Sequence, residues 1–462
     1  MQIREYYEDS YVQARMIEFM GGKRAEESTC VYLLKCDVVE GDCIRKLPTE
    51  LEFFLLNEMD VCRSLWDRKY LLVHLDIEYV NFDFPGEPYL DYERCFQLQQ
   101  PLMDVVMSMF VKYGLKPLHL LSGRGHHFTW CVKQKSPIFH QLAGIGRLSE
   151  NLRKKYREPH PPTGESIGVQ LGKAFSGLGL AIEYLSFEAK AKSVTRIPVQ
   201  ITAVRVEPQE RGREVISIDI SEYADPLDTR MIRIPFSVYH KHFTKRWLIP
   251  DNLRDTLPPI FLIPLTDHDY RKAIRIMRNP DEVHSLARTT SATIPECPKA
   301  MKRLIDDYKA SRLARFHEWF YSQEHEDPEN WLTSYDQAPL DRIPACARNI
   351  LENPNDLLLR PECIRHVVIC FLALGWHPRQ IAGLIRSKYE RNYGWGRLWY
   401  IYDAAERADF YTRVFSGLIE LGYDLLDDFT CEGVKKSGVC FHEDDKHDLA
   451  SLRKSVLKRR WL

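Results

Sequence analysis

The sequence predicts an α+β fold that is followed by a mostly α-helical C-terminal part. Three observations predict this. Short apolar segments with strand character alternate with helical stretches up to about residue 250. Prolines then cluster at Pro250, Pro258, Pro259 and Pro264, which is typical of the exit from a domain. Beyond them, apolar residues recur at the spacing of amphipathic helices.

The first part of the chain alternates between the two kinds of segment. Helical periodicity covers 96–114, with Gly114 as a C-cap candidate, and it covers 177–191 as well. The strand candidates are apolar runs bounded by turn residues or charges, namely 70–79, 118–121, 128–132, 196–206 and 215–220.

The second part of the chain is predicted to be helical. One amphipathic helix is expected over 301–320 and another over 363–374, which Gly375 would stop. We therefore expect three regions, which are a mixed domain at 1–255, a helical linker region at 256–335 and a helical domain at 336–462.

The composition is that of an ordinary globular protein. The 462 residues are 44% hydrophobic and 28% charged, and the net charge of -1 creates no global positive field for nucleic acid. No apolar run approaches the roughly 20 residues that span a bilayer, and the first residues lack the apolar core of a signal peptide. We expect a cytoplasmic protein without a membrane partner, whose cysteines are thiols or metal ligands rather than disulfides.

Two acids lie at the end of the first apolar strand candidate. Asp76 and Glu78 are two residues apart, so a strand projects both from the same face. Carboxylates held that close repel each other unless a cation lies between them, and Mg²⁺ or Mn²⁺ suits such oxygen ligands. The alternative is a solvent-exposed strand end.

A glycine-rich segment, SGRGHH, lies between the next two strand candidates. Gly123 and Gly125 let a backbone approach a ligand closely, and successive N–H groups in such a turn can bind an anion. Arg124 and a histidine would add charge-assisted hydrogen bonds to a triphosphate. The alternative is a hairpin turn with solvated polar residues.

A third segment combines an acid with a basic run. Asp219 ends an apolar strand candidate, and a third carboxylate would let the site hold two cations. Asp225 and Asp228 are rival carboxylates, although Asp225 precedes a proline and is more typical of a turn. The basic and hydroxyl-bearing residues that follow are Arg230, Arg233, Ser237, Tyr239, His240 and Lys241.

Together and in this order, the three segments resemble the archaeo-eukaryotic primase superfamily. Its first motif is a strand ending in Asp-x-Asp or Asp-x-Glu, which Asp76 and Glu78 match. Its second motif is a Ser-Gly-Arg-Gly-x-His turn, in which His127 takes the histidine position. Its third motif is an Asp at a strand end followed by Arg-x-Pro-x-Ser-x-His-x-Lys, which Asp219 and the run at 233–241 match. The match spans roughly residues 1–250.

Two positions depart from the family pattern. The histidine of the third motif is Tyr239 here and His240 is adjacent, so either His240 replaces it or Tyr239 contacts the nucleotide differently. The spacing from Asp219 to Pro235 is longer than the pattern, which leaves Asp228 as an alternative third ligand.

The resemblance implies a primase-polymerase domain with an RRM-like sheet, which joins nucleoside triphosphates on a single-stranded DNA template or extends a primer. Asp76, Glu78 and Asp219 would hold two Mg²⁺ or Mn²⁺ ions. A helicase, or another replication or defence protein, is an expected partner. The residues implied to bind the nucleotide are Ser122, Gly123, Arg124, His127, Arg233, Ser237, His240 and Lys241.

The C-terminal cysteines resemble the iron–sulfur domain of the primase large subunit. Cys346 precedes a helical block, and Cys431 and Cys440 bracket a short polar loop. The fourth cysteine of that family is missing, so the candidates for the fourth ligand are His442, His447 and Cys363. Three cysteines and one histidine would equally suit structural zinc, and a [4Fe-4S] cluster is the alternative.

Two other functions fit the same residues. A metal-dependent nuclease would use the same carboxylates, but it needs neither the Ser-Gly-Arg-Gly-x-His turn nor Lys241. A replication or defence factor that only binds nucleic acid would not need three carboxylates.

Overall fold

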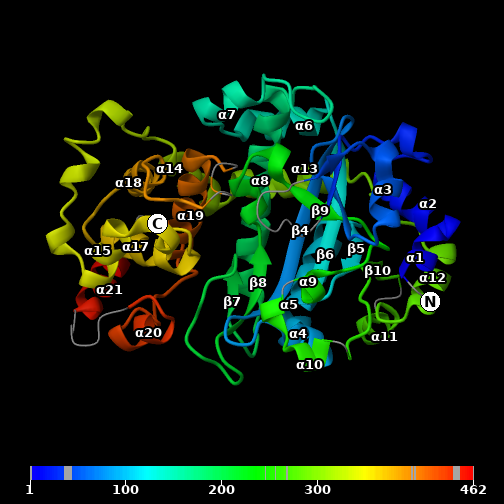
Figure 1. Cartoon of the computed structure of the whole chain (residues 1–462). Coiled ribbons are helices and arrows are strands. Elements are labelled where there is room, and N and C mark those ends of the chain that lie inside the picture. Colours follow the sequence, from blue (N-terminus) through cyan, green and yellow to red (C-terminus); the bar gives the residue numbers. More distant parts are fainter. Residues whose placement is uncertain are drawn as a thin grey trace. The chain divides into compact units, whose positions relative to one another are not determined.

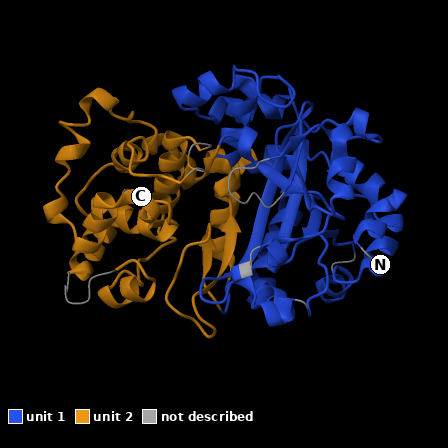
Figure 2. Ribbon diagram, viewed as in Figure 1, with its two compact units in different colours: residues 1–180, 194–196, 226–304 blue, residues 181–193, 197–225, 305–462 orange. Residues whose placement is uncertain are grey.

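The computed structural model describes residues 3–35, 44–244, 246–254, 256–266, 269–396, 399, 402–440 and 448–460. The fold is mixed α/β, and the chain forms two compact units (Figure 2). Unit 1 contains Met1–Leu180, Val194–Arg196 and Pro226–Leu304. Unit 2 contains Ala181–Ser193, Ile197–Asp225 and Ile305–Leu462. The units therefore interleave along the chain, whereas the expected regions at 1–255, 256–335 and 336–462 are contiguous.

Unit 1 contains antiparallel strands in two groups, and Figure 1 labels β4, β5, β6 and β10 of the first group. In the first group the strands are neighbours in the order β10, β5, β6, β4, and in the second the order is β2, β1, β3, β9. Their bounds are β1 Leu33–Lys35, β2 Arg45–Lys46, β3 Val61–Ser64, β4 Tyr70–Asn81, β5 Leu118–Leu121, β6 Gly125–Lys133, β9 Met231–Arg233 and β10 Ile263–Pro264.

The long pairing of β4 with β6 forms the centre of unit 1. It runs in register from Tyr70 opposite Lys133 to Glu78 opposite Gly125. Because side chains alternate along a strand, the apolar residues of both strands gather on one face. Helix α5 (Tyr92–Tyr113) packs against that face, and the ring of Phe110 meets that of Phe128 at 4.9 Å. His74, Asp76 and Glu78 of β4 therefore share the opposite face.

The helix expected at 96–114 is confirmed as α5, which begins a few residues earlier. Gly114 ends it with a φ of 63°, a left-handed conformation that glycine adopts without steric cost. The other helices of unit 1 are α1 Ile3–Glu8, α2 Ser10–Phe19, α3 Leu51–Leu56, α4 Glu87–Leu90, α6 Pro137–Ile145, α7 Glu150–Lys155, α9 Lys241–Thr244, α10 Asp251–Arg254, α11 Tyr270–Ile276 and α12 Pro280–Thr289. The residues of α8 (Val169–Lys192) and α13 (Pro298–Ala310) are shared between the units.

Unit 2 contains a parallel strand pair and a set of helices. Strand β7 (Val199–Ile201) pairs with β8 (Glu214–Asp219), so the strand expected at 196–206 is much shorter than predicted. The helices are α14 Arg312–Phe320, α15 Ala345–Glu352, α16 Pro354–Leu357, α17 Pro361–Ala373, α18 Pro378–Tyr389, α19 Ala404–Glu420, α20 Cys431–Lys436 and α21 Leu449–Lys458.

The prediction of one helix over 301–320 is wrong, because the chain forms α13 and α14 there. Ser311 separates them, and its hydroxyl accepts a hydrogen bond from the Ala314 N–H at 3.1 Å. A serine side chain at this position satisfies an N–H group at a helix start, so it favours a new helix over continuation. The helix expected at 363–374 is confirmed as α17, and Gly375 follows it with a φ of 85°.

The interior of unit 2 contains a buried ionic cluster. The Glu183 carboxylate accepts hydrogen bonds from the Arg413 guanidinium at 2.8 Å and lies 3.0 Å from His317 Nε2. All three side chains are almost completely buried. Burial by itself raises the pKa of Glu183, but Arg413 and His317 outweigh it and hold the pKa below its ordinary value. The carboxylate is therefore a fixed negative charge that depends on its two partners.

Two further expectations concern the whole chain. Within the described part, no helix is both long and apolar enough to cross a bilayer. Nine of the described cysteines are thiols, as expected, but Cys62 on β3 is disulfide-bonded, contrary to the expectation for that residue. A disulfide depends on the distance between two Cα atoms in the fold, which the spacing along the chain does not reveal.

Candidate active site

Asp76 and Glu78 lie on the face of β4 that α5 does not cover. Asp76 is directly opposite His127 on β6, and His127 Nε2 is 3.4 Å from Asp76 Oδ1. The shared face is as predicted. The acids are not at the end of the strand, however, because β4 continues to Asn81. The extra length arises after Glu78, where the Tyr79 N–H donates to the carbonyl of Arg124 at 3.1 Å.

The glycine-rich segment contains a shorter turn than predicted. Strand β6 begins at Gly125, so His126 and His127 are strand residues and point to opposite faces. His126 lies on the core side, 2.9 Å from His119 and edge-on to Phe96. Burial lowers the pKa of His126 to about 3. His126 is therefore a neutral core histidine, and His127 faces the acids.

His127 is held between two neighbours. Its Nδ1 is 3.1 Å from His74 Nε2, and its Nε2 faces Asp76. Burial lowers the pKa of His127 well below its ordinary value, and the nearby His74, Arg233 and Arg124 lower it further. The ring is therefore neutral at neutral pH.

Arg124 forms an ion pair with Glu78. Burial by itself lowers the pKa of Arg124, but the Glu78 carboxylate outweighs it, so the pKa is higher than usual. Arg124 Nε is buried and has no hydrogen-bond partner among the described residues. The backbone of Arg124 is fixed as well, because its carbonyl accepts a hydrogen bond from Gln99 Nε2 at 3.1 Å. The guanidinium thus keeps one unused donor beside the acids.

The two glycines of the turn lie close to other parts of the protein, and packing requires a glycine at position 125. A Cβ on Gly125 would be 2.0 Å from the carbonyl oxygen of Ile77. A Cβ on Gly123 would be 3.1 Å from the ring of Tyr239 and 3.2 Å from that of Tyr89. The close approach expected of these glycines is therefore made to other parts of the same chain.

The third segment brings Tyr239, rather than His240, into the interior. The Tyr239 ring is 3% exposed, lies 4.3 Å from the Arg233 guanidinium, and its hydroxyl is 3.1 Å from that of Tyr89. Arg233 also pairs with Asp60 at 3.0 Å. His240 is partly exposed. Both alternatives for this departure from the family pattern therefore remain predictions.

Ser237 and Lys241 occupy different surroundings. Ser237 is fully buried, and its hydroxyl oxygen accepts a hydrogen bond from the Val61 N–H at 2.7 Å. This contact connects the loop after β9 to β3. Lys241 is the first residue of α9 and is partly exposed. The roles predicted for both in nucleotide binding remain predictions.

The three candidates for the third carboxylate differ in their contacts. Asp219 is the last residue of β8 in unit 2, is partly exposed, and accepts a hydrogen bond from the Ser221 N–H at 2.9 Å. Asp225, also in unit 2, pairs with Arg407 at 3.2 Å. Asp228, in unit 1, lies 3.1 Å from Lys155 Nζ. Asp225 and Asp228 are buried against cations, so Asp219 remains the better candidate, and its approach to Asp76 remains a prediction.

The C-terminal cysteines lie near one another in unit 2. Cys346 Sγ is 3.0 Å from His366 Nε2. Burial, together with the nearby Cys440 and Cys431, raises the pKa of the Cys346 thiol to about 12. The sequence did not suggest His366, whose one signal is its polarity within the apolar helix α17. His442 lies outside the described residues. Among those described, no three His, Cys, Asp or Glu side chains are arranged as metal ligands.

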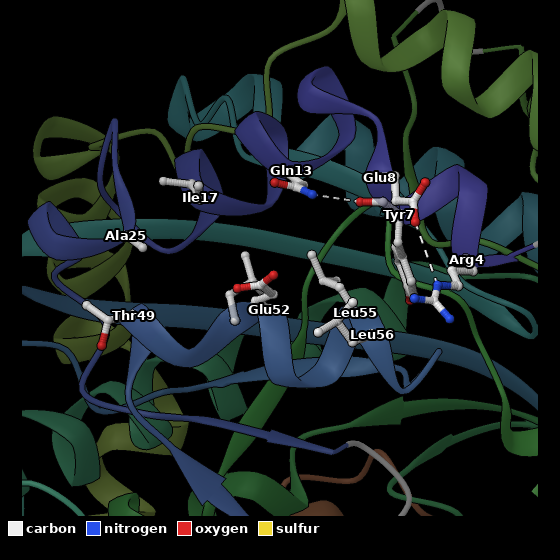
Figure 3. Close-up of a pocket in the computed structure, with 11 residues that line it drawn as sticks. Arg4, Tyr7, Glu8, Gln13, Ile17, Ala25, Thr49, Glu52, Leu55 and Leu56 are labelled. Carbon is white, nitrogen blue, oxygen red and sulfur yellow. Dashed lines mark hydrogen bonds and ion pairs between the residues drawn. The ribbon is translucent and has the colours of Figure 1, made fainter.

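A pocket of about 380 Å³ lies elsewhere in unit 1 (Figure 3). Figure 3 shows Gln13 bonded to the Tyr7 backbone and Arg4 paired with Glu8, and no residue predicted for the site lines this pocket. Its relation to the site is indirect. The Tyr7 hydroxyl accepts a hydrogen bond from the Val238 N–H at 2.9 Å, so helix α1 supports the loop before Tyr239.

Comparisons with protein-family models, curated proteins and solved structures found no match to this chain.

Proposed function

We propose that the chain is a template-directed nucleotidyltransferase of the primase-polymerase type, built on the archaeo-eukaryotic primase fold with its RRM-like sheet. One observation carries the proposal. Two carboxylates, Asp76 and Glu78, share a face of the sheet with His127, and Arg124 in the turn before β6 pairs with Glu78. Oxygen ligands for cations next to donors for phosphate are what phosphoryl transfer requires.

The donor set is suited to Mg²⁺ or Mn²⁺. Magnesium is commonly bound by one or two carboxylates together with the phosphates of the substrate, and Asp76 and Glu78 supply the carboxylates. Asp219 is proposed as the third ligand. When bound, the cations would activate the primer 3′-hydroxyl and stabilise the departing pyrophosphate.

The basic residues bind and orient the triphosphate in this proposal. Arg124 offers its unused Nε–H to a phosphate oxygen, and His127 offers a neutral N–H. Arg233, between Asp60 and Tyr239, is held rigidly and contributes positive charge. Fixed donors of this kind stabilise developing charge without reorganisation during the reaction.

The substrates proposed are nucleoside triphosphates, in the ribo or deoxyribo form, with a single-stranded DNA template and a primer. The C-terminal part is proposed to bind template and the primer 5′ end, with a metal or iron–sulfur centre on Cys346, Cys431, Cys440 and a fourth ligand. A helicase or another replication or defence protein is a proposed partner.

The test is a primer-synthesis assay on single-stranded DNA with each nucleotide set and with Mg²⁺ or Mn²⁺. We expect incorporation by the natural chain and none by Asp76→Asn. Asp104→Asn is the matched control, because Asp104 is an exposed carboxylate on α5. Full activity of Asp76→Asn would contradict the metal assignment. Degradation of the DNA without incorporation would favour the nuclease, and binding without either reaction would favour the non-enzymatic factor.

A further inference from the structure

Helix α11 carries a row of arginines that none of the three motifs uses. Arg271 and Arg275 are one helical turn apart, so they lie on the same face, and Arg278 follows just beyond the helix. Arg271 and Arg275 are exposed, and Arg275 Nε donates to the Arg271 carbonyl at 3.2 Å. Because the net charge of the whole chain is -1, this row is a local concentration of positive charge.

Tyrosines, rather than carboxylates, hold two of these arginines. The Arg278 guanidinium lies over the ring of Tyr92, with Cζ 3.7 Å from the ring centroid, and its Nη1 donates to the Ile274 carbonyl at 2.6 Å. Arg271 Nε donates to the Tyr270 hydroxyl at 3.3 Å. Within the described part of the chain, none of the three arginines forms an ion pair with a carboxylate. They are therefore oriented without being neutralised.

Arg278 shows the cost of this arrangement. Burial lowers the pKa of Arg278 to about 10, although Tyr92 opposes the shift. Its Nη2 is buried and has no hydrogen-bond partner among the described residues. The guanidinium is still charged at neutral pH, and burial of a charge without a counter-ion is unfavourable. An anion bound nearby would offset part of this cost.

The row of arginines lies close to the candidate site. The peptide unit between Ile260 and Phe261 connects the two, because the Ile260 carbonyl accepts a hydrogen bond from the Tyr239 N–H at 2.7 Å and the Phe261 N–H donates to the Met277 carbonyl at 2.9 Å. The C=O and N–H of a trans peptide point in opposite directions, so Tyr239 and Met277 flank the same peptide unit. Arg278 directly follows Met277.

We propose that Arg271, Arg275 and Arg278 form a contact surface for the phosphate backbone of single-stranded DNA next to the candidate site. The proposal rests on the proposed function only for the use that is made of the strand. Arg271 and Arg275 contact phosphates directly, and Arg278 adds a fixed charge. A guanidinium held by an aromatic ring keeps its N–H groups for an anion. Positive charge beside aromatic rings is typical of surfaces that bind single strands.

The test measures binding of a labelled oligothymidylate by fluorescence anisotropy at several salt concentrations. A length of about 20 nucleotides exceeds the site that one domain usually covers. In the full-length Arg271→Gln/Arg275→Gln variant, the Kd should rise by about tenfold, because two exposed ion pairs with phosphates are lost. The salt dependence, as the magnitude of the slope of log Kd against log salt, should fall by about 0.7 for each lost contact.

The matched control is Arg147→Gln/Arg153→Gln, which removes two exposed arginines elsewhere in unit 1 and changes the net charge equally. It should bind the oligothymidylate as the natural chain does. Arg271→Lys/Arg275→Lys keeps both charges and should keep the natural salt dependence.

Arg278→Met distinguishes binding from folding. It removes a buried charge, so the melting temperature should not fall, while the affinity for the oligothymidylate should decrease. A lower melting temperature with unchanged affinity would assign Arg278 to folding and overturn its part in the surface.

The outcomes separate this surface from the proposed function. Natural affinity and salt dependence in Arg271→Gln/Arg275→Gln would overturn the proposal, as would an equal loss in the control pair or no binding by the natural chain. If the variants behave as expected but the natural chain incorporates no nucleotide, the proposed function fails and the surface stands. If primers are made while Arg271→Gln/Arg275→Gln binds the strand normally, the surface fails and the proposed function stands.

Discussion

The guanidinium of Arg124 and the carboxylate of Glu78 form an ion pair beside Asp76, so one proposed phosphate donor is held by one proposed metal ligand. A cation on Glu78 would compete with the Arg124 guanidinium for the negative charge of this carboxylate. We therefore expect a bound cation to weaken the pair and to leave Arg124 more donors for a phosphate. Cation and triphosphate should accordingly bind cooperatively.

Replacing Arg124 by methionine should have opposite effects on the two ligands. Without the competing guanidinium, the affinity for Mn²⁺ in the absence of nucleotide should rise by about tenfold, a fraction of what Coulomb's law allows at this separation. The KM for the triphosphate should rise by about tenfold or more. Electron paramagnetic resonance titration measures the first and steady-state kinetics the second. Arg94→Met is the control, because Arg94 pairs with Glu87 instead. A loss of Mn²⁺ affinity in Arg124→Met would contradict the competition between Arg124 and the cation for Glu78.

Replacement of the two adjacent histidines should separate catalysis from packing. His127→Phe removes a donor that faces Asp76, so kcat/KM should fall by about tenfold or more while the melting temperature changes little. His126→Phe alters the core side, where His126 contacts His119, so it should change stability and leave kcat/KM within about twofold. Equal losses of kcat/KM in both variants would contradict the assignment of faces. Kinetics and thermal unfolding measure these effects.

Adding a methyl group at Gly125 should strongly reduce the stability of the folded protein. The new Cβ would be 2.0 Å from the Ile77 carbonyl oxygen, so β4 and β6 cannot keep their register in Gly125→Ala. We expect loss of soluble protein or a destabilisation of several kcal/mol, measured by urea unfolding. Gly144→Ala in α6 is the control, because nothing lies within 4 Å of the added atom, and it should be neutral or stabilising. Wild-type stability of Gly125→Ala would contradict the described register.

The buried pair of Glu183 and Arg413 should control acid stability in unit 2. The pKa of Glu183 is lower in the folded protein, where burial opposes the larger effect of Arg413 and His317. A lowered pKa gives stability that is complete above the unfolded pKa of about 4.3 and is lost as the pH falls through the folded value. Arg413→Met should cost about 3–5 kcal/mol at neutral pH, because it leaves a buried charge without its partner. Urea unfolding between about pH 3 and 7, where carboxylates titrate, measures the free energy of unfolding in both cases. An Arg413→Met variant with unchanged stability would contradict the prediction.

The metal content of the C-terminal part tests the cysteine assignment. We expect Cys346→Ser and Cys431→Ser to lose the metal of the natural protein, whereas Cys370→Ser, a buried thiol on α17, should keep it. Elemental analysis and visible absorption of anaerobically purified protein distinguish iron–sulfur from zinc. Metal-free natural protein would contradict the assignment. A His366→Ala variant shows in the same assay whether the partner of Cys346 is a ligand.

The periodicity of the sequence predicted local structure well where neighbouring residues decide it. The apolar run before Asp76 predicted β4, and the spacing before Gly114 predicted α5 together with its end. The two-residue spacing of Asp76 and Glu78 predicted their common face, because alternation is a property of the extended backbone itself. Periodicity predicted the bounds of the SGRGHH turn less well, because the start of β6 depends on its pairing with β4.

The sequence by itself thus determined the mixed fold class, the main strand and helix of unit 1, and the clustering of acids with basic donors in three segments. Tertiary structure decided which donor contacts which acid, namely Arg124 with Glu78 and His127 with Asp76. It also placed His74 in contact with His127. It also engaged Asp228 with Lys155 and Tyr239 with Arg233. The reason is physical. Periodicity depends on residues a few positions apart, whereas these contacts depend on strand register and on side chains that are distant along the chain.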